Sequence, residues 1–116
     1  MIDPQGGMTL EEIKSLVHAQ AVGNFSATND HGITLNQALI DPLRISVIAR
    51  SVREGRVTDE QLDVWLVGQE RNEHGYKIIM REDGLQFGLA TRGFPADKDP
   101  VLCGWYGGLL AAFLGM

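Results

Sequence analysis

The C-terminal run, residues 100–116, most constrains what this chain can fold into, because it carries no charged side chain. Small residues recur four apart in it, as Gly104, Gly108 and Ala112. On a helix such a row lies on one side and lets another backbone come close. A helix of this length rises about 25 Å, less than the hydrocarbon core of about 30 Å. We therefore expect a buried helix packed against a sheet, not a membrane span.

The beginning of this run, together with the residue before it, is typical of a helix start. Asp99 suits the N-cap and Pro100 suits the first helical position. Cys103 would then lie near the helix N-terminus, but in an apolar run it is more simply a small buried side chain. Because Cys103 is the single cysteine, no internal disulfide can form, which favours a reducing, cytoplasmic setting.

The N-terminal part of the chain predicts an amphipathic helix over residues 10–22. Thr9 and Glu12 have the spacing of a capping box. The apolar stripe that follows consists of Leu10, Ile13, Leu16, Val17 and Ala21. We expect residues 1–8 to form a flexible extension and residues 9–116 to form one domain.

Four runs in the middle of the chain alternate as strands do. They are residues 43–52, 62–69, 76–81 and 85–91. The short links between the last three, including Glu82-Asp83-Gly84, favour antiparallel neighbours. A fifth, short edge strand over 33–40 is an alternative that Asp41-Pro42 would end. We expect an α+β fold of order α-β-β-β-β-α, with an antiparallel meander sheet of four strands or, with the edge strand, five.

The two faces of this sheet differ in what could cover them. Leu62, Val64 and Leu66 lie on the face expected to form the core. The opposite face holds Trp65, and we place Ile48 and Ile79 beside it. Basic side chains surround these residues, which is a composition typical of binding hot spots. The alternative is that the C-terminal helix covers this face and the basic side chains reach past it to solvent.

Charge narrows the classes of partner. The formal net charge is -5, which disfavours nucleic acid and favours a basic protein. Arginines lie in and after the first strand run, and an acidic group surrounds the second. That group consists of Asp59, Glu60, Asp63, Glu70 and Glu73. If the two strands pair, some of these charges meet across the ladder, and the others form an acidic edge that can steer a basic partner.

Only the loop over residues 24–31 contains the parts of a hydrolytic site. Ser26, Asp30 and His31 supply a hydroxyl, a carboxylate and an imidazole. The simpler interpretation is a solvated connector, because the same residue types dominate loops. The histidines and the cysteine lack metal-ligand spacing, and we expect no cofactor.

These features together predict a small, acidic protein-binding module of the cytoplasm that is not an enzyme and does not bind membranes. The most specific hypothesis is a bacterial immunity protein that binds and neutralises a toxin or effector. Its contact residues would be Trp65, Asp59, Glu60, Asp63, Glu70 and Glu73. One alternative is a homodimeric secretion chaperone or adaptor, so monomer and homodimer both remain open. Another is a small hydrolase that uses the loop over residues 24–31.

Overall fold

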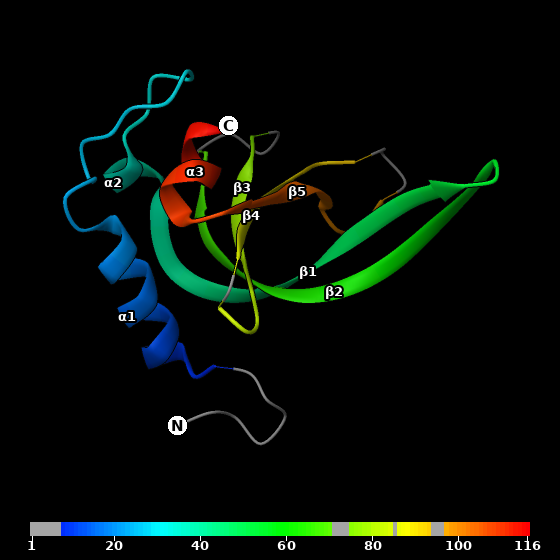
Figure 1. The fold of residues 1–116 in the computed structure, drawn as a ribbon, viewed down its shortest axis with the longest axis horizontal. Helices are drawn as coiled ribbons and strands as arrows, with labels where there is room; N and C mark the ends of the chain where they lie inside the picture. Colours follow the sequence, from blue (N-terminus) through cyan, green and yellow to red (C-terminus); the bar gives the residue numbers. More distant parts are fainter. Residues whose placement is uncertain (1–7, 71–74, 85, 94–96) are drawn as a thin grey trace.

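The structure is a computed structural model that describes residues 8–70, 75–84, 86–93 and 97–116 (Figure 1). It is a mixed α+β fold with a helix at each end and a five-stranded sheet between them. The elements are α1 (Leu10–Ala21), α2 (Leu35–Ala38), β1 (Leu39–Arg53), β2 (Arg56–Gln69), β3 (Lys77–Arg81), β4 (Phe87–Thr91), β5 (Val101–Gly107) and α3 (Leu109–Leu114).

The sheet is closed as a barrel, so the expected open meander is wrong. Each strand from β1 to β4 pairs antiparallel with the next, and β5 returns to β1. Because five is an odd number, the closing pair must be parallel. That pair joins Ile48 to Val101, and the Ile48 N–H donates to the carbonyl of Pro100 at 2.8 Å. Closure pairs the edges of β1 and β4 that an open sheet would leave exposed.

The expected C-terminal helix is wrong over its first half. Residues from Val101 onward form β5, and a helix begins only after Gly108. Gly107 turns the chain between the two elements with a φ of 84°, a conformation that glycine adopts without strain. Pro100 therefore precedes a strand rather than opening a helix. In the described part of the chain, no helix has the length and apolar composition needed to cross a membrane.

The expected edge strand over residues 33–40 is also wrong. Thr34 caps the short helix α2: its hydroxyl accepts from the Gln37 N–H at 3.2 Å, and its own N–H donates to the Gln37 side chain at 2.9 Å. Leu39 already opens β1, and Pro42 lies inside that strand. The β1–β2 register shifts between Leu39 and Leu43, an irregularity at which a residue without an N–H is tolerated.

The predicted N-terminal helix is confirmed as α1. The Thr9 hydroxyl accepts from the Glu12 N–H at 3.3 Å, and the Glu12 carboxylate accepts from the Thr9 N–H at 3.2 Å. Met8, expected within the extension, is half-buried and packs against the core. Residues 1–7 lie outside the described residues.

Two apolar clusters form the core, one on each side of the sheet. The inner cluster fills the barrel with Val47, Val64, Leu66, Ile79 and Ala90. The outer cluster lies between the barrel and the helices α1 and α3, and it includes Trp65, Ile78, Met80, Ile13 and Phe113. Register places Met80 opposite Trp65 and Ile79 opposite Leu66, so the expected grouping of Trp65 with Ile79 is wrong. The helices α1 and α3 therefore cover the face that holds Trp65.

Candidate functional site

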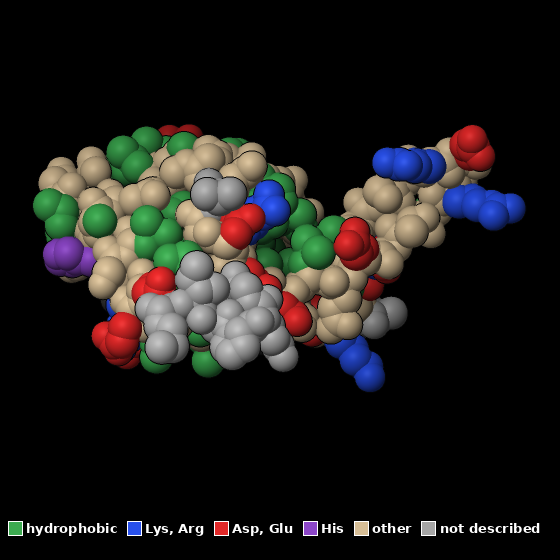
Figure 2. Space-filling view, turned by 60° about the horizontal axis from the view of Figure 1, so that its bottom comes forward, with side chains coloured by type: hydrophobic (Ala, Val, Ile, Leu, Met, Phe, Trp, Pro, Cys, Tyr) green, Lys and Arg blue, Asp and Glu red, His purple; other side chains and the backbone are tan. Residues whose placement is uncertain are grey.

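A two-stranded projection extends from the barrel, formed by the distal halves of β1 and β2 (Figures 1 and 2). We call residues 49–60 the hairpin arm. Glu54 and Gly55 form its turn with φ values of 51° and 76°, the positive pair that a tight two-residue hairpin uses. Every residue from 51 to 61 is exposed. The sequence analysis missed this hairpin because Glu-Gly is a weaker turn signal than Asn-Gly or Asp-Gly.

One face of the hairpin arm presents an apolar pair to solvent. Val52 lies opposite Val57 in the β1–β2 register. They are 67% and 64% exposed, more than any other large hydrophobic side chain in the described residues. A two-stranded ribbon is marginally stable on its own in water. An exposed apolar pair contributes no hydrophobic stabilisation to it until another surface buries the two side chains.

Ion pairs anchor the base of the hairpin arm. Arg50 lies opposite Asp59 and donates to its two carboxylate oxygens at 2.8 and 2.9 Å. The same guanidinium donates to Asp97, just before β5, at 2.9 and 3.1 Å. The hydrogen bonds from Arg50 lower the pKa of Asp59, and those carboxylates raise the pKa of Arg50. The predicted meeting of charges across the ladder is confirmed for this pair.

Replacing Arg50 with glutamine should raise the pKa of Asp59 toward that of an ordinary aspartate. Because the folded-state pKa of Asp59 is depressed, its contribution to stability is present above the unfolded-state pKa and is lost as the pH falls through the folded-state value. Carbon-13 NMR titration of the Asp59 carboxyl measures the shift. The control is Arg53→Gln, an exposed arginine on the opposite face of the arm. If the titration midpoint of the Asp59 carboxyl is the same in Arg50→Gln as in the wild-type chain, Arg50 is not the cause of its lowered pKa.

The structure brings together three of the predicted acidic contact residues. Asp59, Glu60 and Asp63 all lie on the exposed half of β2, and Asp59 and Asp63 share one face. The Ser46 hydroxyl donates to Asp63 at 3.0 Å, whereas Glu60 lies on the other face, opposite Ala49.

The remaining predicted contact residues lie apart from this group. Glu70 follows the far end of β2, where its carboxylate is hydrogen-bonded to the His31 ring. Trp65 is only 8% exposed, and Arg44 lies over its ring at 5.3 Å from the ring centre. Its buried indole N–H has no hydrogen-bond partner among the described residues. Trp65 therefore offers little surface to a partner. Glu73 lies outside the described residues.

The loop over residues 24–31 uses its polar groups to hold its own shape. The Asn29 side chain accepts from the backbone N–H groups of His31 and Ile33 at 3.0 and 3.3 Å. The His31 ring stacks on Tyr76 with 5.9 Å between ring centres and pairs with Glu70. Its partner is thus neither Ser26 nor Asp30, and the loop lends no support to the hydrolase alternative.

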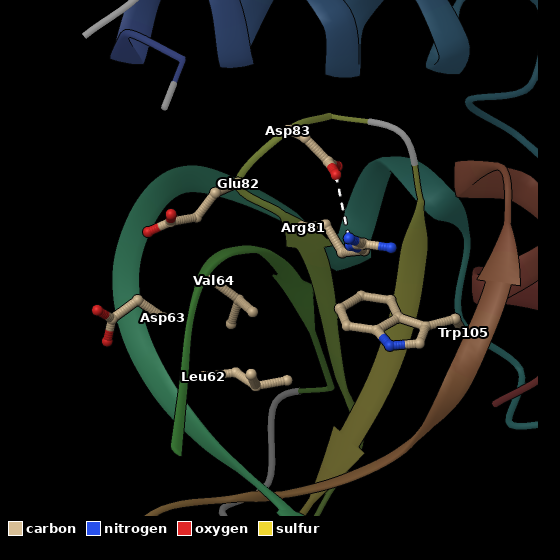
Figure 3. Close-up of a pocket in the computed structure, with 7 residues that line it drawn as sticks. All are labelled: Leu62, Asp63, Val64, Arg81, Glu82, Asp83 and Trp105. Atoms are coloured by element: carbon tan, nitrogen blue, oxygen red, sulfur yellow. Dashed lines mark ion pairs between the residues drawn. The ribbon is translucent and has the colours of Figure 1, made fainter. Parts of the chain in front are cut away.

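A cavity of about 380 Å³ lies at the mouth of the barrel, beside the end of β3 (Figure 3). We call it the mouth cavity. It is lined by Leu62, Asp63, Val64, Arg81, Glu82, Asp83 and Trp105. Leu62 and Val64 point toward the Trp105 ring, whereas Asp63 points away from it. The mouth cavity is therefore an apolar slot with a charged rim.

The charges on this rim are partly compensated. Arg81 lies 6.0 Å from the centre of the Trp105 ring and pairs with Asp83 at 3.2 Å. Glu82 forms an ion pair with Arg44 from β1. The sequence analysis missed this cavity because it assigned Trp105 to a helix. The alternation of Trp105 with small residues is equally compatible with a strand.

Cys103 lies on β5 rather than at a helix N-terminus. Its side chain is exposed, so the expected buried position is wrong. Partial desolvation by neighbouring groups raises the pKa of its thiol. Its sulfur lies 3.9 Å from the carbonyl oxygen of Val101. The helix dipole that would have made it nucleophilic is not beside it, so it keeps its proton at neutral pH. Among the described residues, no three His, Cys, Asp or Glu side chains are grouped to hold a metal ion.

Comparison with known proteins finds no match to this chain. No family model matches it. No curated protein matches it, and no solved structure does. The functional argument therefore rests on the hairpin arm, the acidic residues of β2 and the mouth cavity.

Proposed function

We propose that this chain is a protein-binding module that contacts its partner through the hairpin arm. The exposed pair of Val52 and Val57 carries this proposal. The pair sits on a projecting ribbon whose base is held by Arg50. Anchoring at its base reduces the conformational freedom that the ribbon loses on binding, so more of the contact energy appears as affinity.

The charge of the chain favours a basic protein as the partner. The net charge is -5, and Asp59, Glu60 and Asp63 lie along the exposed half of β2. Such a surface speeds association with a basic protein and repels a second acidic copy. The most specific form of the proposal is a bacterial immunity protein that neutralises a toxin or effector in the cytoplasm. The small size of the chain and its acidic, projecting surface support that form.

Replacing both Val52 and Val57 with serine should weaken partner binding about 30-fold. The lost burial of two valines costs about 2 kcal/mol, and each 1.4 kcal/mol is tenfold in Kd. The partner is obtained by co-purification with the tagged chain from its source cells at equal stoichiometry. Calorimetry with the two purified proteins then compares the variants. The matched control is Val22→Ser, an exposed valine at the end of α1 that is 55% exposed.

Two outcomes would contradict this proposal. If the partner binds the double variant as tightly as the wild-type chain, the hairpin arm is not part of the interface. A chain that is dimeric alone by light scattering, and monomeric as the double variant, would assign the arm to a homodimer. That second result would favour the chaperone or adaptor alternative.

A further inference from the structure

The outer edge of β2 is paired along only half of its length. Its pairing with β3 runs from Val64, opposite Arg81, to Gln69, opposite Lys77. From Arg56 to Asp63, β1 is the sole strand neighbour of β2 within the described ranges. The backbone groups along this edge are a template on which another strand can add.

The mouth cavity begins where the pairing of β2 with β3 ends. Leu62, Asp63 and Val64 line it from β2, and Arg81 lines it from the last position of β3 (Figure 3). A strand added along residues 56–63 would therefore point toward the end of β3 and pass the cavity. The free edge and the mouth cavity are parts of one surface.

The two faces of this edge differ in chemistry because side chains alternate along β2. Leu62 faces Trp105 inside the mouth cavity. Asp59 and Asp63 lie on the opposite face. An added strand would therefore present its own alternate side chains to an apolar slot on one face and to carboxylates on the other.

Positive charge compensates only part of the carboxylate face, because Arg50 pairs with Asp59. Asp63 accepts a hydrogen bond from the uncharged Ser46, and no ion pair to it is formed among the described residues. Asp59 shares the single guanidinium of Arg50 with Asp97. Lysine or arginine side chains of a partner would complete this face. A second copy joined edge to edge through β2 would instead bring acidic residues together, and like charges opposite each other destabilise a ladder.

We infer that the free edge of β2 and the mouth cavity together bind an extended segment of the partner in which basic and apolar residues alternate. The segment adds to β2 as a strand, with its basic side chains toward Asp59 and Asp63 and an apolar side chain between Leu62 and Trp105. This inference rests on the proposed function and names the part of the partner that is recognised.

The test uses the purified full chain and a short peptide of alternating lysine and valine. NMR should show saturable shifts at residues 56–63 and at the Trp105 indole, and hydrogen exchange at the edge amides should slow at least tenfold. Asp63→Asn should weaken binding at least threefold. The matched control is Asp30→Asn, an exposed aspartate in the loop over residues 24–31, which should not change it. Added salt should weaken binding as well.

Two further peptides separate strand addition from simple charge attraction. A lysine–valine peptide N-methylated at every amide has no N–H group to donate to the ladder from either edge, and an alternating glutamate–valine peptide reverses the charge. Neither should bind. If the methylated peptide binds as tightly as its parent, strand addition is wrong. If the glutamate–valine peptide binds as tightly as the lysine–valine peptide, the preference of the edge for basic side chains is wrong.

The outcome also distinguishes this inference from the proposed function. Absence of binding by the lysine–valine peptide, combined with a partner that still requires Val52 and Val57, would overturn the edge site and leave the hairpin arm as the interface. Protection of residues 56–63 in a dimer of the chain alone would assign the edge to a second copy and overturn the inference.

Discussion

Gly88→Ala should destabilise the barrel by about 3 kcal/mol or more, a large share of the roughly 5–15 kcal/mol that holds a domain folded. Gly88 lies on β4 opposite Trp105 on β5. A Cβ added there would come within 2.6 Å of the Trp105 ring and closer still to the carbonyl oxygen of Gly104. That carbonyl belongs to the paired β5 backbone, so it cannot move without disturbing the strand pairing. Urea denaturation followed by circular dichroism measures the loss.

Gly104→Ala is the matched control for this substitution. Both glycines lie on the β4–β5 pair, but the atom nearest to a Cβ at Gly104 is a Tyr106 ring carbon at 3.9 Å, an ordinary contact distance. Its stability should therefore stay close to that of the wild-type chain. Equal denaturation midpoints for the two alanine variants would contradict the close approach of β4 and β5 at Gly88.

Phe113→Ala should lower the free energy of unfolding by about 3–5 kcal/mol. Phe113 is fully buried in the outer cluster, together with Ile13 and Val17 of α1. The helix α3 spans only Leu109–Leu114, too short to be stable without tertiary packing. Removing its largest buried side chain leaves a cavity and also weakens the attachment of the helix to the barrel. Thermal and urea denaturation measure the effect.

The neighbouring residue provides the control for Phe113→Ala. Leu114 lies in the same helix but is 47% exposed. Leu114→Ala should change stability by about 0.5 kcal/mol or less, as exposed substitutions generally do. A Phe113→Ala chain that is no less stable than Leu114→Ala would mean that α3 does not anchor the outer cluster.

The start of α1 was the part of the fold that sequence reasoning identified most directly. The capping box at Thr9 lies within one turn of chain and needs no tertiary partner, so it predicted α1 directly. The same signal was present at Thr34 and Gln37 and would have identified α2.

The C-terminal run could not be assigned from its own residues. Val101, Trp105 and Tyr106 suit a strand, whereas small residues four apart suit a closely packed helix. Whether the run forms a strand or a helix depends on whether an unpaired strand edge is available to pair with it. The edges of β4 and β1 are available, and residues 101–107 pair with both of them as β5.

Some features of the candidate site could likewise be predicted from neighbouring residues, whereas others depend on distant segments. Asp59, Glu60 and Asp63 are close in sequence, so any strand through them brings them to one region. The burial of Trp65 and the position of Trp105 at the cavity depend on register and closure between distant segments. Because neither is encoded locally, the sequence did not show that Trp65 is buried or that Trp105 lines the mouth cavity.

The sequence alone thus determined the N-cap of α1, the alternation within the strands, the acidic charge and the grouping of carboxylates on β2. Each of these depends on neighbours a few residues apart. Tertiary structure alone decided that the sheet closes, that the C-terminal run enters it, and which half of β2 remains unpaired. Those outcomes depend on competition among distant segments for the same backbone edges, and this competition is what leaves the hairpin arm and the edge from Arg56 to Asp63 open to a partner.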